Sequence, residues 1–164
     1  MSTTKASIKK ILIAGAGNPL RRDDGVGPYI IKEISQMSHD NKRHTIRYVD
    51  VGTDGLVLFD MMQHYTHTLL VDAIHMNTSP GTIKVFTPKD VKVNMYHDSL
   101  STHALGLATL IHLLEQFRIK TSLKIIGIQP ESIELGEGLT QTVSLRLDTL
   151  LHTVAFEINS LINP

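Results

Sequence analysis

Short apolar segments alternate with segments of helical periodicity along most of this chain, and this alternation restricts the folds available to it. Strands are predicted at Ile8–Gly15, Thr45–Val51 and Thr66–Ala73, because each is a short and mostly apolar run. Helices are predicted between them, one over Val26–Ile34 and one from about Asp54. Strands that are separated by helices usually pair in parallel, so the sequence predicts an α/β fold with a mainly parallel sheet.

The second half of the chain adds an edge strand, a further strand and two more helices. A Pro-Gly turn precedes the run Thr82–Phe86, which is predicted to pair antiparallel at one edge of the sheet. Ser101 or Thr102 is expected to cap a helix with an apolar stripe, and Leu123–Gln129 is the last predicted strand. Apolar residues at helical spacing over Val143–Leu161 predict a final, core-facing helix. The sheet is therefore expected to be mixed.

The length of the chain fits one domain. A chain of 164 residues with 41% hydrophobic content is expected to bury roughly two-thirds of its unfolded surface. No repeat or long linker divides it, so residues 1–164 are predicted to form a single domain. The longest irregular stretches are expected around residues 87–101 and 130–140, and loops of that length often carry function.

Charge and cysteine content exclude several classes of function. Sixteen basic and sixteen acidic residues give a formal charge of zero, which provides no overall attraction for nucleic acids or anionic membranes. The absence of cysteine excludes disulfides, thiolate nucleophiles and cysteine-ligated zinc or iron-sulfur centres. The polar N-terminal segment lacks the apolar core of a signal peptide, so a cytoplasmic location is expected.

Three polar segments are predicted at the carboxyl ends of strands or beside them, where ligands collect in open α/β sheets. GAGNPLRRDDGVG supplies Asp24 with Asp23 beside it, VDAIH supplies Asp72, and STHALGL supplies His103. Carboxylate and imidazole ligands suit nickel, zinc, manganese or iron, and three protein ligands leave positions open for substrate or water. The positive end of a helix near His103 favours the neutral imidazole that binds metals.

Each of these residues also has a simpler explanation. Asp23 or Asp24, taken alone, is expected to be the N-cap of the helix that follows. Asp72 at a strand end is a common loop cap, and an isolated His103 is most often a surface or capping residue. A metal site therefore depends on the three segments being considered together.

Most of the nine histidines are assigned no part in the chemistry. His75 and His97, with Asp98, lie closer to the predicted site and are candidates for residues that support the ligands. The other histidines are expected to be ordinary surface or capping residues: His39, His44, His64, His67, His112 and His152.

The glycines of the first segment are predicted to reverse the chain after the first strand, with Gly15 and Gly17 at the turn. A dinucleotide-binding fingerprint would require a third glycine at position 20, where Leu20 stands. Asp50 is suitably placed for a ribose contact, but without that glycine nucleotide binding is not expected.

Five segments, in order, closely resemble the hydrogenase maturation protease family: GAGNPLRRDDGVG, VDVGTDGL, VDAIH, STHALGL and GIQPESIELGEGLT. The resemblance extends from about Ile11 to the final helix. It implies a phosphorylase/hydrolase-like three-layer sandwich, in which a twisted, mostly parallel five-stranded sheet is flanked by helices. It also implies a metal-dependent endopeptidase that removes the C-terminal extension of a nickel-iron hydrogenase large-subunit precursor.

The same resemblance assigns the site residues. The family's catalytic and metal-contacting positions match Asp24, Asp72 and His103, although some family members carry the longer Glu at the first of these. Nickel is expected to be supplied by the substrate, held by the precursor's cysteines and read by these three residues. Zinc, cadmium or manganese is expected to occupy the site in vitro. Cleavage would then take place only after nickel has been inserted. The enzyme is expected to be a monomer or weak oligomer.

Two other functions remain compatible with the residues. A nickel-sensing or chaperone module would bind the hydrogenase precursor through the same three ligands without cutting it. A peptidyl-tRNA-hydrolase-like enzyme shares the Gly-Asn-Pro turn, but here Asp23 and Asp24 follow in place of that family's histidine-bearing continuation. The neutral composition also offers no basic groove for tRNA.

Overall fold

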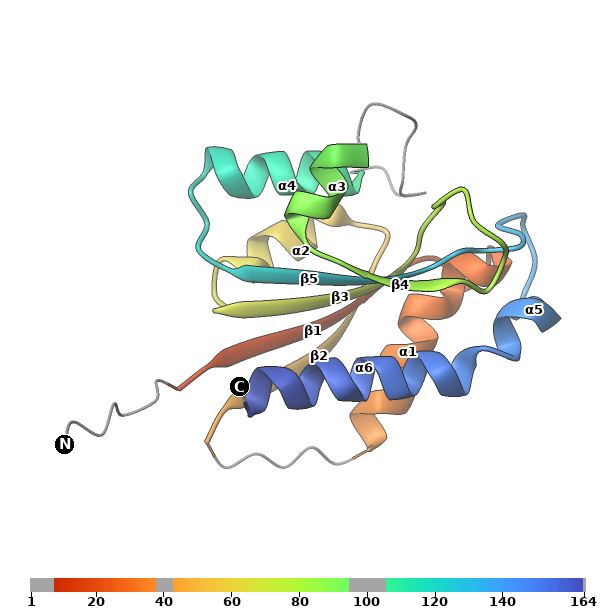
Figure 1. The fold of residues 1–164 in the computed structure, drawn as a ribbon, viewed down its shortest axis with the longest axis horizontal. Coiled ribbons are helices and arrows are strands. Elements are labelled where there is room, and N and C mark those ends of the chain that lie inside the picture. Colours follow the sequence, from red (N-terminus) through yellow and green to blue (C-terminus); the bar gives the residue numbers. More distant parts are fainter. Residues whose placement is uncertain (1–7, 38–42, 95–105, 164) are drawn as a thin grey trace.

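The computed structural model describes residues 8–37, 43–94 and 106–163 (Figure 1). The strands are β1 (Lys10–Ala16), β2 (Thr45–Gly52), β3 (His67–Ala73), β4 (Ile83–Phe86) and β5 (Ser122–Ile128). The helices are η1 (Arg22–Gly25, a 3-10 turn), α1 (Val26–Gln36), α2 (Gly55–Met62), α3 (Pro88–Asn94), α4 (Leu107–Gln116), α5 (Gln141–Ser144) and α6 (Leu147–Ile162).

The five strands form one mixed sheet in the order β2-β1-β3-β5-β4. The first four strands in this order are parallel, whereas β4 pairs antiparallel with β5. The carboxyl ends of the four parallel strands therefore meet at one edge of the sheet. The predicted α/β fold, its mixed sheet and the antiparallel edge strand are confirmed.

Helices cover both faces of the sheet and make three layers (Figure 1). Successive strand residues point to opposite faces, so Ile11 and Ile13 of β1 pack with α1 and α6. Leu12 and Ala14 of the same strand pack with α2, α3 and α4. This burial on both faces explains why the central strands are almost continuously apolar.

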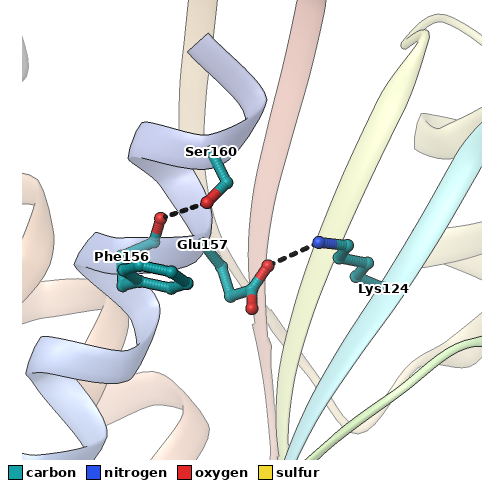
Figure 2. A network of polar contacts seen from close by, with 4 residues as sticks. All are labelled: Lys124, Phe156, Glu157 and Ser160. Atoms are coloured by element: carbon teal, nitrogen blue, oxygen red, sulfur yellow. Dashed lines mark hydrogen bonds and ion pairs between the residues drawn. The ribbon is translucent and has the colours of Figure 1, made fainter. Parts of the chain in front are cut away.

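One ion pair fastens the last helix to the sheet (Figure 2). The Lys124 ammonium of β5 lies 2.6 Å from the Glu157 carboxylate of α6. Glu157 is buried while the Lys124 side chain is 35% exposed, so the two charges are only partly desolvated. Lys124 lies on the same face of β5 as Ile126, which belongs to the core beneath α6.

None of the described helices is both long and apolar enough to span a bilayer.

Three helical details differ from the sequence-based expectation. The predicted final helix is interrupted between Ser144 and Leu147, so α5 and α6 are separate. Helix α4 has Gly106 as its N-cap, with no side-chain cap, and the expected caps at positions 101 and 102 lie outside the described residues. Helix α3 occupies part of the stretch that was expected to be irregular.

The sequence does contain a signal for α3. Thr87 precedes a proline and lies three residues before Asp90, a pattern that begins many helices. The Asp90 carboxylate accepts hydrogen bonds from the Thr87 N–H and hydroxyl, both at 2.7 Å. These bonds hold the pKa of Asp90 below its usual range. The capping pair therefore explains why the helix begins at Pro88.

His67, the first residue of β3, is expected to make the folded state sensitive to mild acid. Burial, then the charge of Lys9 and then His44, hold the pKa of its imidazole below its ordinary 6.5. The folded state therefore binds this proton less readily than the unfolded chain does. The free energy of unfolding keeps its full value above pH 6.5, the ordinary pKa of histidine, and decreases as the pH falls below it. The melting temperature should fall from about pH 7.5 to about pH 5.5, and less in His67→Gln. Equal slopes in the two proteins would contradict the assignment.

Candidate functional site

The carboxyl end of β1 lies directly against the loop that carries the first acidic motif. Gly17 has φ +140°, and a Cβ there would lie 1.7 Å from the carbonyl oxygen of Asp24. A Cβ at Gly27 would lie 2.1 Å from the carbonyl oxygen of Ala16 and 2.7 Å from that of Val71. Because real side chains cannot occupy these spaces, the two glycines let β1, β3 and the start of α1 meet backbone to backbone.

Asp24 lies on η1, between β1 and α1, and is 2% exposed. Its Oδ2 accepts a hydrogen bond from the Asn18 backbone N–H at 2.9 Å. The Asn18 side chain in turn accepts from the Leu20 N–H at 3.0 Å, which closes a tight turn. The N-cap explanation is wrong for both neighbouring aspartates, because α1 has Gly25 as its N-cap and no side-chain cap bond. The Gly-Asn-Pro turn therefore orients the Asp24 carboxylate.

Asp72 is the next-to-last residue of β3 and is 2% exposed. It pairs in register with Gly127 of β5, so it lies at the carboxyl edge of the parallel strands, as predicted. Asp72 also lines a narrow cavity whose described walls include Ala16 of β1, Asp54 and Leu107. The cavity thus brings together the ends of strands and the beginnings of α2 and α4.

The structure brings two of the three predicted ligands to one edge of the sheet. Helix η1, which carries Asp24, contacts β3, which carries Asp72. The approach of Gly27 to Val71 fixes this arrangement through the backbone. His103 lies outside the described residues, and so do the predicted supporting residues 97 and 98. Within the described ranges, no three His, Asp or Glu side chains form a group suited to a metal ion.

Asp23 has a role that the sequence reasoning missed. Its side chain is fully buried, and its carboxylate accepts bonds from the Glu131 N–H at 2.9 Å and the Ser132 N–H at 3.1 Å. It also accepts from the Thr140 N–H at 2.7 Å and from the Thr140 hydroxyl. The sequence contained an indication of this role, because the motif has two adjacent acids and only one of them was expected to contact a metal.

Backbone bonds continue the connection that Asp23 makes. The Arg22 N–H donates to the Gly136 carbonyl at 2.9 Å, and the Gly136 N–H donates to the Leu20 carbonyl at 2.9 Å. The Arg21 Nε donates to the Ile133 carbonyl at 3.1 Å. The loop over residues 130–140 is therefore fastened along its length to the segment that ends at Asp24. Two loops far apart in the sequence are thus joined by hydrogen bonds.

His75 lies close to the candidate site, as predicted. It is exposed and follows β3, and its Nδ1 lies 3.5 Å from the Gln129 side-chain amide. Gln129 also accepts a bond from the Met76 N–H at 2.6 Å through its Oε1. Gln129 thus connects the segment after Asp72 to the start of the loop over residues 130–140. A supporting role for His75 remains a prediction.

The other described histidines lie elsewhere. His44 is buried at the amino end of the sheet, where its Nδ1 accepts from the Lys9 N–H at 3.1 Å. His67 is near this end too, because its neighbour Thr66 accepts from the Lys10 N–H at 3.0 Å. His112 and His152 are exposed on α4 and α6, and His64 is exposed between α2 and β3. His39 lies outside the described residues.

Two nearly buried carboxylates at the open edge of an α/β sheet have a limited set of chemical uses. Their oxygens are suited to coordinate a divalent metal ion, with a histidine from a third segment completing an open site. They can also hold or accept a proton from water at a scissile carbonyl. Both uses fit hydrolysis without a covalent nucleophile from this chain.

Comparison with known proteins finds relatives named for hydrogenases and their maturation. The family model described as hydrogenase maturation protease matches residues 28–157. The hydrogenase 2 maturation protease of Escherichia coli is 30% identical over 151 residues, covering 88% of each protein. The coenzyme F420 hydrogenase subunit delta of Methanothermobacter thermautotrophicus is 26% identical over 155 residues, covering 91% of this chain and 94% of that one.

A solved structure shows the same fold. The hydrogenase maturating endopeptidase HybD from Escherichia coli superposes with a TM-score of 0.78 at 29% identity, covering 92% of this chain and 93% of that one. The likeness therefore extends over almost the whole sheet and its helices.

Proposed function

Because the chain belongs to the hydrogenase maturation protease family and is an endopeptidase of hydrogenase maturation, we propose that it removes the C-terminal extension of a nickel-iron hydrogenase large-subunit precursor after nickel insertion. The observation that carries the proposal is the placement of Asp24 and Asp72, both nearly buried, at one edge of the sheet. The family match also favours this activity over a peptidyl-tRNA-hydrolase-like enzyme.

The proposed site is completed by His103. Leu107, four residues further along the chain, lines the same cavity as Asp72. We therefore expect the side chain at position 103, which lies outside the described residues, to reach this edge. Two carboxylates and one imidazole provide three ligands of the kinds that bind nickel, and they leave coordination positions to the groups that the substrate brings. The chain offers no thiolate, so its own affinity for nickel is expected to be low.

In the proposed mechanism nickel is part of the substrate. The precursor presents nickel held by its own cysteines, and Asp24, Asp72 and His103 bind the open side of the ion. This contact draws the nearby scissile bond to the carboxyl edge of the sheet. A carboxylate there holds a water molecule and takes its proton as the water attacks the carbonyl. It then returns this proton to the peptide nitrogen as the C–N bond breaks, which releases the C-terminal extension as an amine. Without nickel the precursor lacks the group that these residues recognise, so cleavage follows metal insertion.

The nickel requirement is tested by offering the enzyme two forms of one precursor. Purified protein is incubated with metal-free and with nickel-loaded large-subunit precursor, and the mass of the large subunit is followed with time. The loaded form is expected to lose the mass of its C-terminal extension while the metal-free form keeps it. Equal cleavage of both forms would overturn the nickel requirement. Binding of the loaded precursor without any loss of mass would favour a chaperone.

A further inference from the structure

A second cavity lies on the α1 side of the sheet, away from the cavity that Asp72 lines. It has a volume of about 450 Å³, within the range of pockets that bind ligands. Helix α1 forms one wall with Tyr29, Lys32 and Ser35, and Tyr48 and Asp50 of β2 form another. We name this cavity the α1–β2 pocket. Because β2 is an edge strand, the pocket lies at the margin of the sheet.

The charges of the α1–β2 pocket favour an anionic partner. Arg22 and Lys32 line it and are exposed, and neither has a hydrogen-bond or ion-pair partner for its charge among the described residues. Asp50, the acid of the lining, accepts a bond from the Gly52 N–H at 2.8 Å through its Oδ1. Burial raises the pKa of the Tyr48 phenol, so this residue stays neutral and does not oppose an anion. The lining therefore has an excess of positive charge.

The α1–β2 pocket lies beside the turn that orients Asp24. Pro19 of that turn and Gly25, which follows Asp24, both line the pocket. Next to them, Leu20 is 59% exposed and Leu135 is 80% exposed. The Gly136 N–H donates to the Leu20 carbonyl, so the two exposed leucines belong to the fastened loops. Exposed apolar side chains beside a pocket are typical of a surface that another protein covers.

We propose that the α1–β2 pocket binds a segment of the hydrogenase precursor that carries a bulky apolar side chain next to an acidic side chain. This inference rests on the proposed function, because the precursor is the protein that reaches Asp24. The apolar side chain fills the space between Tyr29 and Tyr48, and the acidic side chain pairs with Arg22 and Lys32. The pocket thereby supplies affinity at a distance from the metal.

Because the pocket is proposed to bind the precursor and to take no part in the reaction, substitutions in it should change KM but not kcat. Lys32→Glu reverses one charge, and Ser35→Phe places a ring in the pocket. Each is expected to raise KM for nickel-loaded precursor by about tenfold, the effect of about 1.4 kcal/mol, with kcat unchanged. Lys32→Arg keeps the charge and should retain most of the affinity. Raising the salt concentration should weaken the wild type more than Lys32→Glu.

Matched controls lie on other surfaces. Lys84→Glu reverses an exposed charge on β4, at the opposite edge of the sheet, and Gln116→Phe adds a ring to the exposed end of α4. Both should leave KM unchanged, and all variants should have the melting temperature of the wild type. Unchanged KM in Lys32→Glu and Ser35→Phe, or a fall in kcat alone, would overturn the pocket proposal.

Direct binding distinguishes a failure of the pocket from a failure of the proposed function. The loaded precursor is immobilised, and its affinity for wild type, Lys32→Glu and Lys84→Glu is measured without following cleavage. Weaker binding of Lys32→Glu alone supports the pocket even if no precursor is cut. Equal binding of all three overturns it even if the precursor is cut normally.

Discussion

Asp72→Asn is expected to lower the rate of precursor processing by about 100-fold or more while leaving the fold intact. The amide has nearly the same size as the carboxylate, but it removes the negative charge that is proposed to bind nickel, an interaction of several kcal/mol. Asp72 lies at the end of β3 beside a cavity, so the substitution removes no core packing. Asp24→Asn is expected to have an effect of the same size for the same reason.

The rate is measured as loss of the C-terminal extension from nickel-loaded precursor under single-turnover conditions, and folding is followed by thermal melting. Asp60→Asn is the control, because Asp60 is an exposed aspartate on α2. It should cleave at the wild-type rate. If Asp72→Asn also cleaves at that rate, Asp72 takes no part in the reaction. If it unfolds, the role is structural and the mechanism must be revised.

Asp23→Ala is expected to have the largest effect on stability. The substitution leaves the N–H groups of Glu131, Ser132 and Thr140, and the Thr140 hydroxyl, without the buried carboxylate that accepts their bonds. Each buried donor left without an acceptor costs about 1–3 kcal/mol, so a total of about 3 kcal/mol or more is expected. For a chain of this size the melting temperature should fall by about 6 to 12 °C.

The measurement is a thermal or urea unfolding curve for wild type, Asp23→Ala and Asp23→Asn. The asparagine variant keeps one acceptor oxygen, so its stability should lie between those of the other two. Asp60→Ala, which removes an exposed carboxylate, should have the same free energy of unfolding as the wild type. A loss below about 1 kcal/mol in Asp23→Ala would show that the two loops are held together by other contacts.

The fold could be predicted from the sequence because its main signals are local. Apolar runs on both faces of β1 and β3, and helical stripes between them, follow directly from burial in a parallel sheet. The edge position of β4 followed from a Pro-Gly turn and a short run. Errors arose where the signal was weaker, as at the capping pair of Thr87 and Asp90 that begins α3. The break after α5 was missed because the apolar stripe continues across it.

The candidate site could be predicted only in part. The carboxyl ends of strands follow from the topology, so Asp24 and Asp72 were placed correctly at one edge of the sheet. The adjacent acids indicated a second role for one of them, but not the inward orientation of Asp23, because it depends on contacts with the loop over residues 130–140, more than a hundred residues away in the sequence. The α1–β2 pocket has no motif, since its lining comes from separate elements that are each ordinary in sequence.

The backbone contact at Gly27 limits how this enzyme can be altered by evolution or by design. The backbone of α1 contacts the ends of β1 and β3 without intervening side chains. The backbone segments that carry Asp24 and Asp72 therefore cannot shift relative to each other. In the proposed mechanism, a preference for an ion of another radius would then come from a change in side-chain length at this edge, as in Asp24→Glu, which adds one methylene. The metal preference would change one residue at a time while the backbone stays the same.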